Sequence, residues 1–182
     1  MTEFLNALKE SAPSLYIRNS LYVFPIFESI HVMGLTLVFG TIAIMDLRLL
    51  GIASTNRPFS RVKSDILKWT WLAFAVTLIT GATMFITNAP AYYINLQFRL
   101  KMLCIALAGL NMVIFELTTG RKAHHWDNQR SGPSAAKLAG ALSLLLWISV
   151  IFFGRWIGFT VGGENTAPST APADPSIEDI FK

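Results

Sequence analysis

The sequence predicts an all-α integral membrane protein: a four-helix bundle with both chain ends on the outer side, a short N-terminal interfacial helix and an extended C-terminal tail. Of its 182 residues, 53% are hydrophobic and 14% are charged, whereas soluble domains carry about 25% charged residues. The apolar residues form four blocks, each long enough to cross a hydrocarbon core that needs about 20 helical residues. We expect spans at about residues 21–46, 67–88, 98–117 and 135–160.

The distribution of basic residues predicts the orientation of this bundle. Lys and Arg cluster in two segments that connect spans, at residues 48–68 and 121–137. The positive-inside rule places both segments in the cytoplasm and both chain ends outside. The net charge of +4 is therefore a topology signal and does not indicate a nucleic acid partner.

The chain divides into three parts around these spans. Residues 1–19 are expected to form an amphipathic segment at the membrane interface, although a frayed terminus explains them equally well. Residues 20–162 form the four-span membrane domain. Residues 163–182 are rich in Pro, Ala, Ser and Thr and end acidic, a composition typical of a flexible tail.

Each span carries its own local signals. Pro25 either opens the first helix or kinks it. The second span carries Ala73, Thr77 and Gly81 at intervals of four residues, a stripe of small side chains that favours close helix packing. An external turn before the third span is expected at Asn88, Pro90, Tyr92 and Tyr93.

A glutamate and a histidine lie inside the first apolar block, three residues apart, so a helix places Glu28 and His31 on one face. Ionisable groups at membrane depth are costly and by default suggest a functional site. The alternating topology puts Lys101 and Arg155 in the same outer half of the membrane. Asp46 lies about 22 Å further along the first helix, at a rise of about 1.5 Å per residue, and belongs to the inner end.

This outer group of side chains is suited to haem b. Haem iron needs an axial ligand, most often a histidine, and His31 is the candidate metal ligand. Lys101 and Arg155 would bind the two propionates. Glu28 would orient the imidazole or carry a proton, and Trp147 would supply a flat apolar wall. The function predicted on this basis is electron transfer or redox sensing on the periplasmic side, which leaves enzymatic activity open.

The haem hypothesis departs from the common pattern in one respect. Most transmembrane b-type cytochromes hold haem between two histidines, but His124 and His125 lie in a loop on the other side of the membrane. Met84, Met102 or a histidine of a neighbouring subunit would then be the sixth ligand, or the iron would be five-coordinate.

Three other interpretations fit the same residues. His31 bonds Glu28 or a threonine between helices, with a purely structural role. Glu28 and His31 relay protons in a carrier or channel for a small solute, which requires an oligomer. The protein is an assembly subunit of a membrane complex with no chemistry of its own.

Several stretches together resemble a family of bacterial four-helix inner-membrane proteins that is catalogued only as a domain of unknown function. The stretches are Glu28-Ser-Ile-His31, Asp46-Leu-Arg-Leu-Leu-Gly51, Thr80-Gly81, Phe98-Arg-Leu-Lys101, Leu110-Asn111, Ser143-Leu-Leu-Leu-Trp147 and Gly154-Arg155. The general plan is also similar to small b-type cytochromes and to the membrane domain of copper-resistance proteins, which is an analogy of fold alone.

The family resemblance implies a multi-pass protein of the bacterial inner membrane and brings no established activity. Membrane lipid is the first expected partner. Small residues four apart, such as Gly154 and Gly158, favour a homo-oligomer. A redox partner or a quinone would follow from the haem hypothesis.

Overall fold

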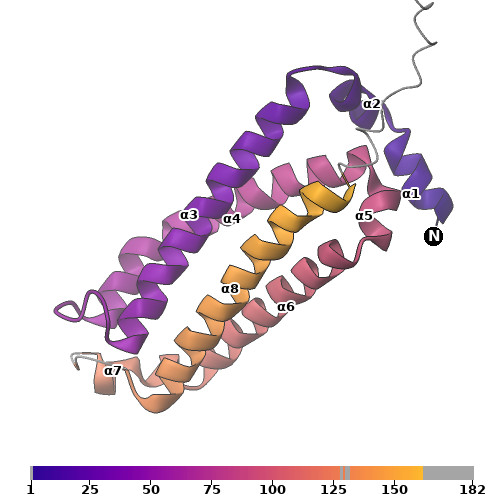
Figure 1. The fold of residues 1–182 in the computed structure, drawn as a ribbon. Coiled ribbons are helices and arrows are strands. Elements are labelled where there is room, and N and C mark those ends of the chain that lie inside the picture. Colours follow the sequence, from indigo (N-terminus) through magenta and orange to yellow (C-terminus); the bar gives the residue numbers. More distant parts are fainter. Residues whose placement is uncertain (1, 128, 130–131, 162–182) are drawn as a thin grey trace, which may run out of the picture.

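The computed structural model describes residues 2–127, 129 and 132–161, and this part of the chain is all-α. Four long helices form the bundle (Figure 1): α3 (Val23–Leu50), α4 (Phe59–Thr87), α6 (Leu96–Leu117) and α8 (Ser134–Val161). Each of them is long and apolar enough to cross a membrane. The predicted fold class, a four-helix membrane bundle, is therefore confirmed, whereas its orientation across the membrane stays a prediction.

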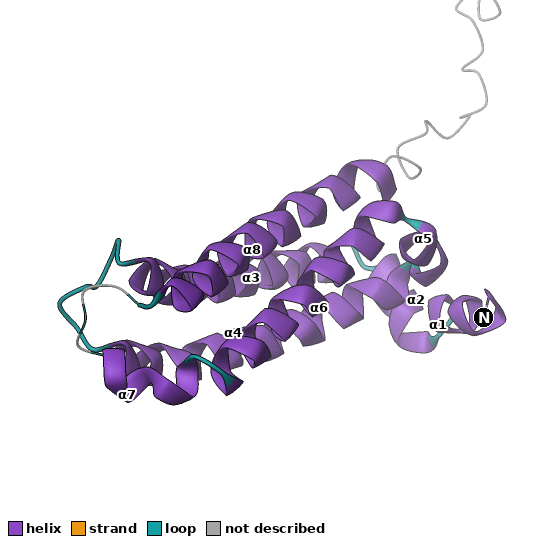
Figure 2. Ribbon diagram, turned by 90° about the horizontal axis from the view of Figure 1, so that it is seen from below, coloured by secondary structure: helices purple, strands orange, loops and turns teal. Residues whose placement is uncertain are grey.

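Short helices cover the two ends of the bundle (Figure 2). At one end, here named the α5 end, lie α1 (Thr2–Lys9), α2 (Ala12–Asn19) and α5 (Ala89–Ile94). At the other, the α7 end, lie the 3-10 turn η1 (Gly120–Lys122) and α7 (Ala123–Trp126). The predicted flexible tail, residues 163–182, lies outside the described residues.

The N-terminal segment forms two helices that pack against the bundle. α1 contacts α4 and α5, and α2 contacts α3 and α4. Leu5 and Ile17 are buried in these contacts. The Ser14 hydroxyl donates a hydrogen bond to the carbonyl of Ile86, 3.2 Å away. This segment therefore closes the α5 end of the fold, and its placement at a lipid interface stays a prediction.

The bundle consists of two helix pairs. α3 packs along α4, α6 packs along α8, and a contact between α3 and α8 joins the pairs. Aromatic side chains bridge α4 and α6 at both ends, with ring centroids 5.9 Å apart for Phe59 and Phe115 and 5.4 Å apart for Phe85 and Phe98. The central core is apolar and consists of Val38, Ala73, Ala108, Leu146, Trp147 and Val150.

Two helix boundaries differ from the spans expected from hydropathy. α4 begins at Phe59 rather than at residue 67, because its polar first turns continue the helix beyond the apolar block. Phe59 is buried against Trp126 and Phe115 at the α7 end. Residues 89–94 form α5 rather than a turn, with a proline in the first turn where its missing N–H costs nothing.

The segment Asp46-Leu-Arg-Leu-Leu-Gly51 closes the α7 end. The Arg48 side chain is 1% exposed and donates to three loop carbonyls: Nε to Arg57 at 2.9 Å, and Nη2 to Asp127 at 3.2 Å and Gln129 at 3.0 Å. Gly51 ends α3 in a left-handed conformation, with φ at 77°. One buried arginine thus ties the loop after α3 to the loop after α7.

Candidate functional site

The imidazole of His31 lies between α3 and α4, close to the α5 end. Nδ1 lies 3.0 Å from the carbonyl oxygen of Thr77 and 3.1 Å from the hydroxyl oxygen of Thr80. A carbonyl can only accept, and the Thr80 hydroxyl donates to its own helix at Val76. Nδ1 therefore carries the proton, and the unshared electron pair of the neutral ring is on Nε2.

A glycine on α4 sets the position of the ring. A Cβ atom at Gly81 would lie 2.9 Å from Cε1 of His31 and 3.4 Å from Nδ1, so no larger residue fits without moving the ring. On α3, about one turn after His31, a Cβ added at Gly34 would lie 2.5 Å from the hydroxyl of Thr77. The close helix packing predicted from Ala73, Thr77 and Gly81 is confirmed, and α3 is the helix that packs against them.

Nε2 of His31 points away from these hydrogen bonds. No described residue forms a hydrogen bond with Nε2, whereas Nδ1 has both partners on α4. The ring is half-buried. The site thus presents one fixed imidazole with a free nitrogen.

Lys101 on α6 lies within electrostatic range of this imidazole. The side chain runs over Gly154 of α8, where an added Cβ would lie 3.5 Å from Nζ. No carboxylate of the described residues forms an ion pair with it. Four helices therefore contribute to the site: α3, α4, α6 and α8.

Glu28 on α3 and Arg155 on α8 are both exposed. In the described part of the chain, neither forms an ion pair, and the hydrogen bonds of the His31 ring do not involve Glu28. Glu28 instead lies near Tyr92 of α5. Burial raises the pKa of the Tyr92 phenol, and the negative charge of Glu28 raises it further.

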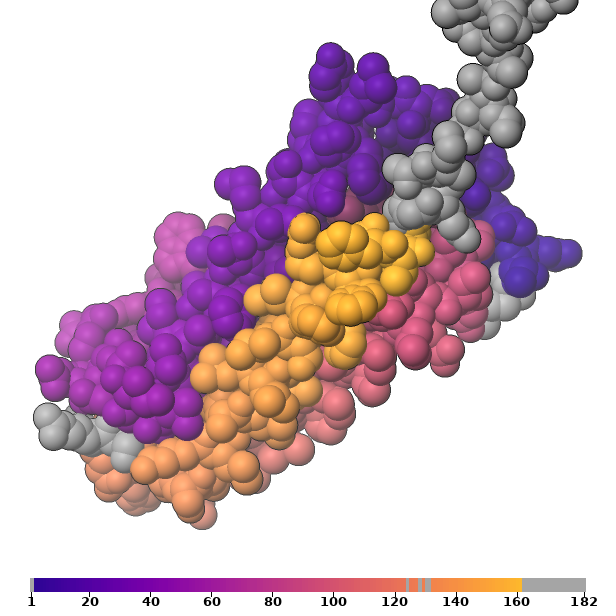
Figure 3. Space-filling model, in the orientation of Figure 1, coloured from indigo at the N-terminus to yellow at the C-terminus, as the bar shows by residue number. Residues whose placement is uncertain are grey.

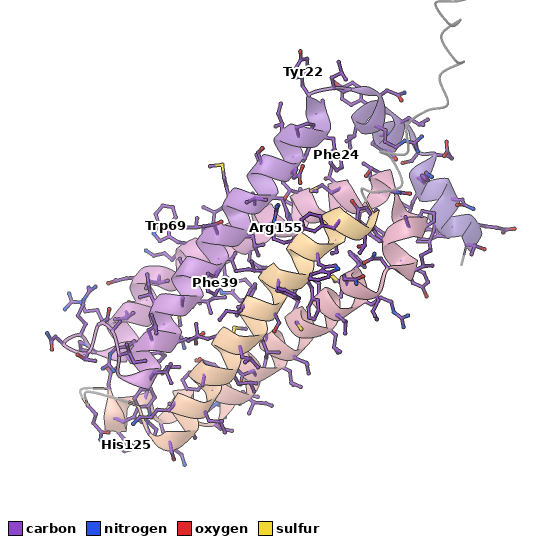
Figure 4. All side chains as sticks on the ribbon, viewed as in Figure 1. Tyr22, Phe24, Phe39, Trp69, His125 and Arg155 are labelled. Atoms are coloured by element: carbon purple, nitrogen blue, oxygen red, sulfur yellow. The ribbon has the colours of Figure 1, made fainter. Side chains whose placement is uncertain are left out.

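The helices diverge where the exposed charges lie. α3 and α8 are in contact, but they separate toward the α5 end (Figures 1 and 3). Arg155 lies near the end of α8, on the side that faces α3 (Figure 4). Trp147, two turns earlier on α8, is buried in the central core.

The structure separates His125 from this site, because His125 lies at the α7 end (Figure 4). Met102 is exposed on α6. Among the residues that can be described, no three His, Cys, Asp or Glu side chains gather into a metal site. His31 is thus the single imidazole at its end of the bundle within the described ranges.

The comparisons with known proteins give one result. The model of a family described as "Family of unknown function (DUF6644)" matches residues 16–160. The chain belongs to this family. The match confirms the predicted membership in a family of unknown function. It extends from α2 to α8, so it contains every residue of the candidate site. No curated protein and no solved structure matches the chain.

Proposed function

We propose that this member of the DUF6644 family binds haem b through Nε2 of His31 and serves in electron transfer or redox sensing. The observation that carries the proposal is the orientation of the imidazole. Nδ1 donates to the Thr77 carbonyl at 3.0 Å, and Nε2 has no partner in the described chain. Histidines that bind metals almost always donate their other ring N–H to a carbonyl, a carboxylate or water, which fixes the tautomer and makes the ligand more basic.

The charges around the ring suit the rest of a haem. Its propionates favour Lys and Arg, and Lys101 interacts with His31 while no described carboxylate neutralises it. Arg155 faces the side on which α3 and α8 diverge. Trp147 lies two turns deeper on α8, in the apolar core, and would be the apolar wall of the site. Glu28 is an exposed titratable group on α3. Bound haem would supply one-electron chemistry, and this chain would contribute His31 as the first ligand and Lys101 and Arg155 as counter-charges.

The apolar core favours a cofactor site over a pathway for solute. Between His31 and Asp46 the bundle is filled by Val38, Ala73 and Val150, all buried. These residues leave no polar route from one end of the described bundle to the other. A site for a flat, largely apolar group near the α5 end needs no such route.

The test is an absorption spectrum of protein purified in detergent from cells supplied with haem. The wild type should show a Soret band, and His31→Ala should lose it. His125→Ala is the matched control because it removes an imidazole at the opposite end, and it should keep the band. His31→Gly should regain the band when imidazole is added. A wild type without a Soret band, or a His31→Ala variant that retains it, would overturn the proposal.

A further inference from the structure

A second ionisable side chain is buried in the bundle, far from His31. Asp46 lies on α3 about one turn before the helix ends, and it is 6% exposed. Its Oδ2 atom has no hydrogen-bond partner among the described residues. Fifteen residues of helix, about 22 Å, separate it from His31, so it needs an explanation of its own.

The carboxyl group of Asp46 is enclosed by the contact between α3 and α8. Gly140 lets α8 approach the backbone there, since a Cβ at this position would lie 3.1 Å from the Asp46 carbonyl oxygen. Ser143, one turn later on α8, is the polar side chain that interacts with the carboxyl. On α6, the Asn111 amide is occupied with the carbonyl of Ala139, 2.9 Å away.

Within the described part of the chain, no cation on the helices packed here compensates a charge on this carboxyl. Arg48, two residues along α3, donates to the carbonyls of the α7-end loops. Lys137 of α8 is exposed. Lys63 of α4 pairs with Glu116 of α6. An ionised carboxylate that is buried without a counter-ion is strongly disfavoured, and such a group takes up a proton instead.

We propose that Asp46 is a proton-binding site within the contact between α3 and α8. In the native bundle its carboxyl is the neutral acid, and on deprotonation the proton passes to water at the α7 end, about one helical turn away. Asp46→Asn reproduces the shape and neutrality of the protonated form. The site does not depend on haem, and it would link the α3–α8 contact to the pH at the α7 end.

The first test is the pH dependence of unfolding. A native state that holds a proton more tightly than the unfolded chain loses stability as the pH rises. The unfolding equilibrium constant of the wild type should therefore increase with pH, by up to about tenfold per pH unit for one proton, and Asp46→Asn should lack this component. Asp65→Asn is the control: Asp65 is exposed and paired with Arg57 at 3.0 Å, so this variant should keep the wild-type dependence.

The second test does not require a variant at Asp46. Infrared difference spectra of the wild type, between neutral and high pH, should contain a carboxylic acid C=O band that shifts in D2O. Ser143→Ala should change the frequency of this band, because it alters the polar neighbour of the acid. Absence of the band, or the same pH dependence of unfolding in the wild type and Asp46→Asn, would overturn the proposal.

Discussion

The substitution Gly81→Ala tests whether the position of His31 is set by the surface of α4. The new Cβ would lie 2.9 Å from Cε1 of the ring, closer than carbon atoms pack, so the imidazole must move away from Thr77. Overpacking of this kind lowers the free energy of unfolding by about 1–3 kcal/mol. Alanine in a helix raises the free energy of unfolding by about 1 kcal/mol relative to glycine, which offsets part of this loss.

A matched control separates these two contributions. Gly109 lies on α6 with nothing within 4 Å of an added Cβ, so Gly109→Ala should receive only the gain in helix propensity. The two variants should therefore differ by about 1–3 kcal/mol in the free energy of unfolding. For a chain of this size, each kcal/mol corresponds to about 2–4 °C in Tm.

The assay is thermal unfolding in detergent, combined with 15N NMR of histidine-labelled protein. The His31 resonances should shift in Gly81→Ala and not in Gly109→Ala, since the Nδ1 hydrogen bond to Thr77 changes only in the first variant. If both variants gain stability equally and leave the His31 signals unchanged, Gly81 does not position the ring and the reasoning is wrong.

Two further predictions follow from contacts at the two ends of the bundle. Arg48→Met leaves three loop carbonyls without their donor and should lower the free energy of unfolding by about 2–5 kcal/mol. Proteolysis of the loop after α3 should become faster. An unchanged melting temperature would contradict this prediction. Glu28→Gln removes the negative charge near Tyr92, so the pKa of this phenol should fall toward its ordinary value. The ultraviolet titration of the tyrosines, with Tyr92→Phe to identify the signal, measures this shift, and an identical titration in both proteins would refute the proximity.

The four spans were predictable because hydropathy is a local property of the sequence. The ends of the helices were less so. α4 extends eight residues before its apolar block, from residue 67 back to 59, because Phe59 packs against Trp126, which lies far away along the chain. α5 was expected as a turn because its proline and tyrosines give no helical periodicity over so few residues.

For the candidate site, the sequence predicts which side chains take part but not the contacts that they make. The sequence identifies His31 and Lys101 as ionisable groups at membrane depth, and the structure places them within electrostatic range of each other. The sequence does not identify the hydrogen-bond acceptor of the ring, because the Thr77 carbonyl is a backbone group 46 residues away. The loop carbonyls that accept hydrogen bonds from Arg48 could not be predicted from the sequence for the same reason. Such contacts depend on how helices cross, which no local pattern encodes.

The unequal closure of the two ends has a mechanical consequence. Arg48 and the loops around it bind the α3–α4 pair to the rest of the chain at the α7 end, whereas α3 and α8 diverge at the α5 end. The spacing of α3 and α8 is therefore fixed at Arg48, whereas at the α5 end the stacked rings of Phe85 and Phe98 join α4 to α6 and leave α3 and α8 apart. Any change in this spacing would be largest at the α5 end, where α3 and α8 lie apart.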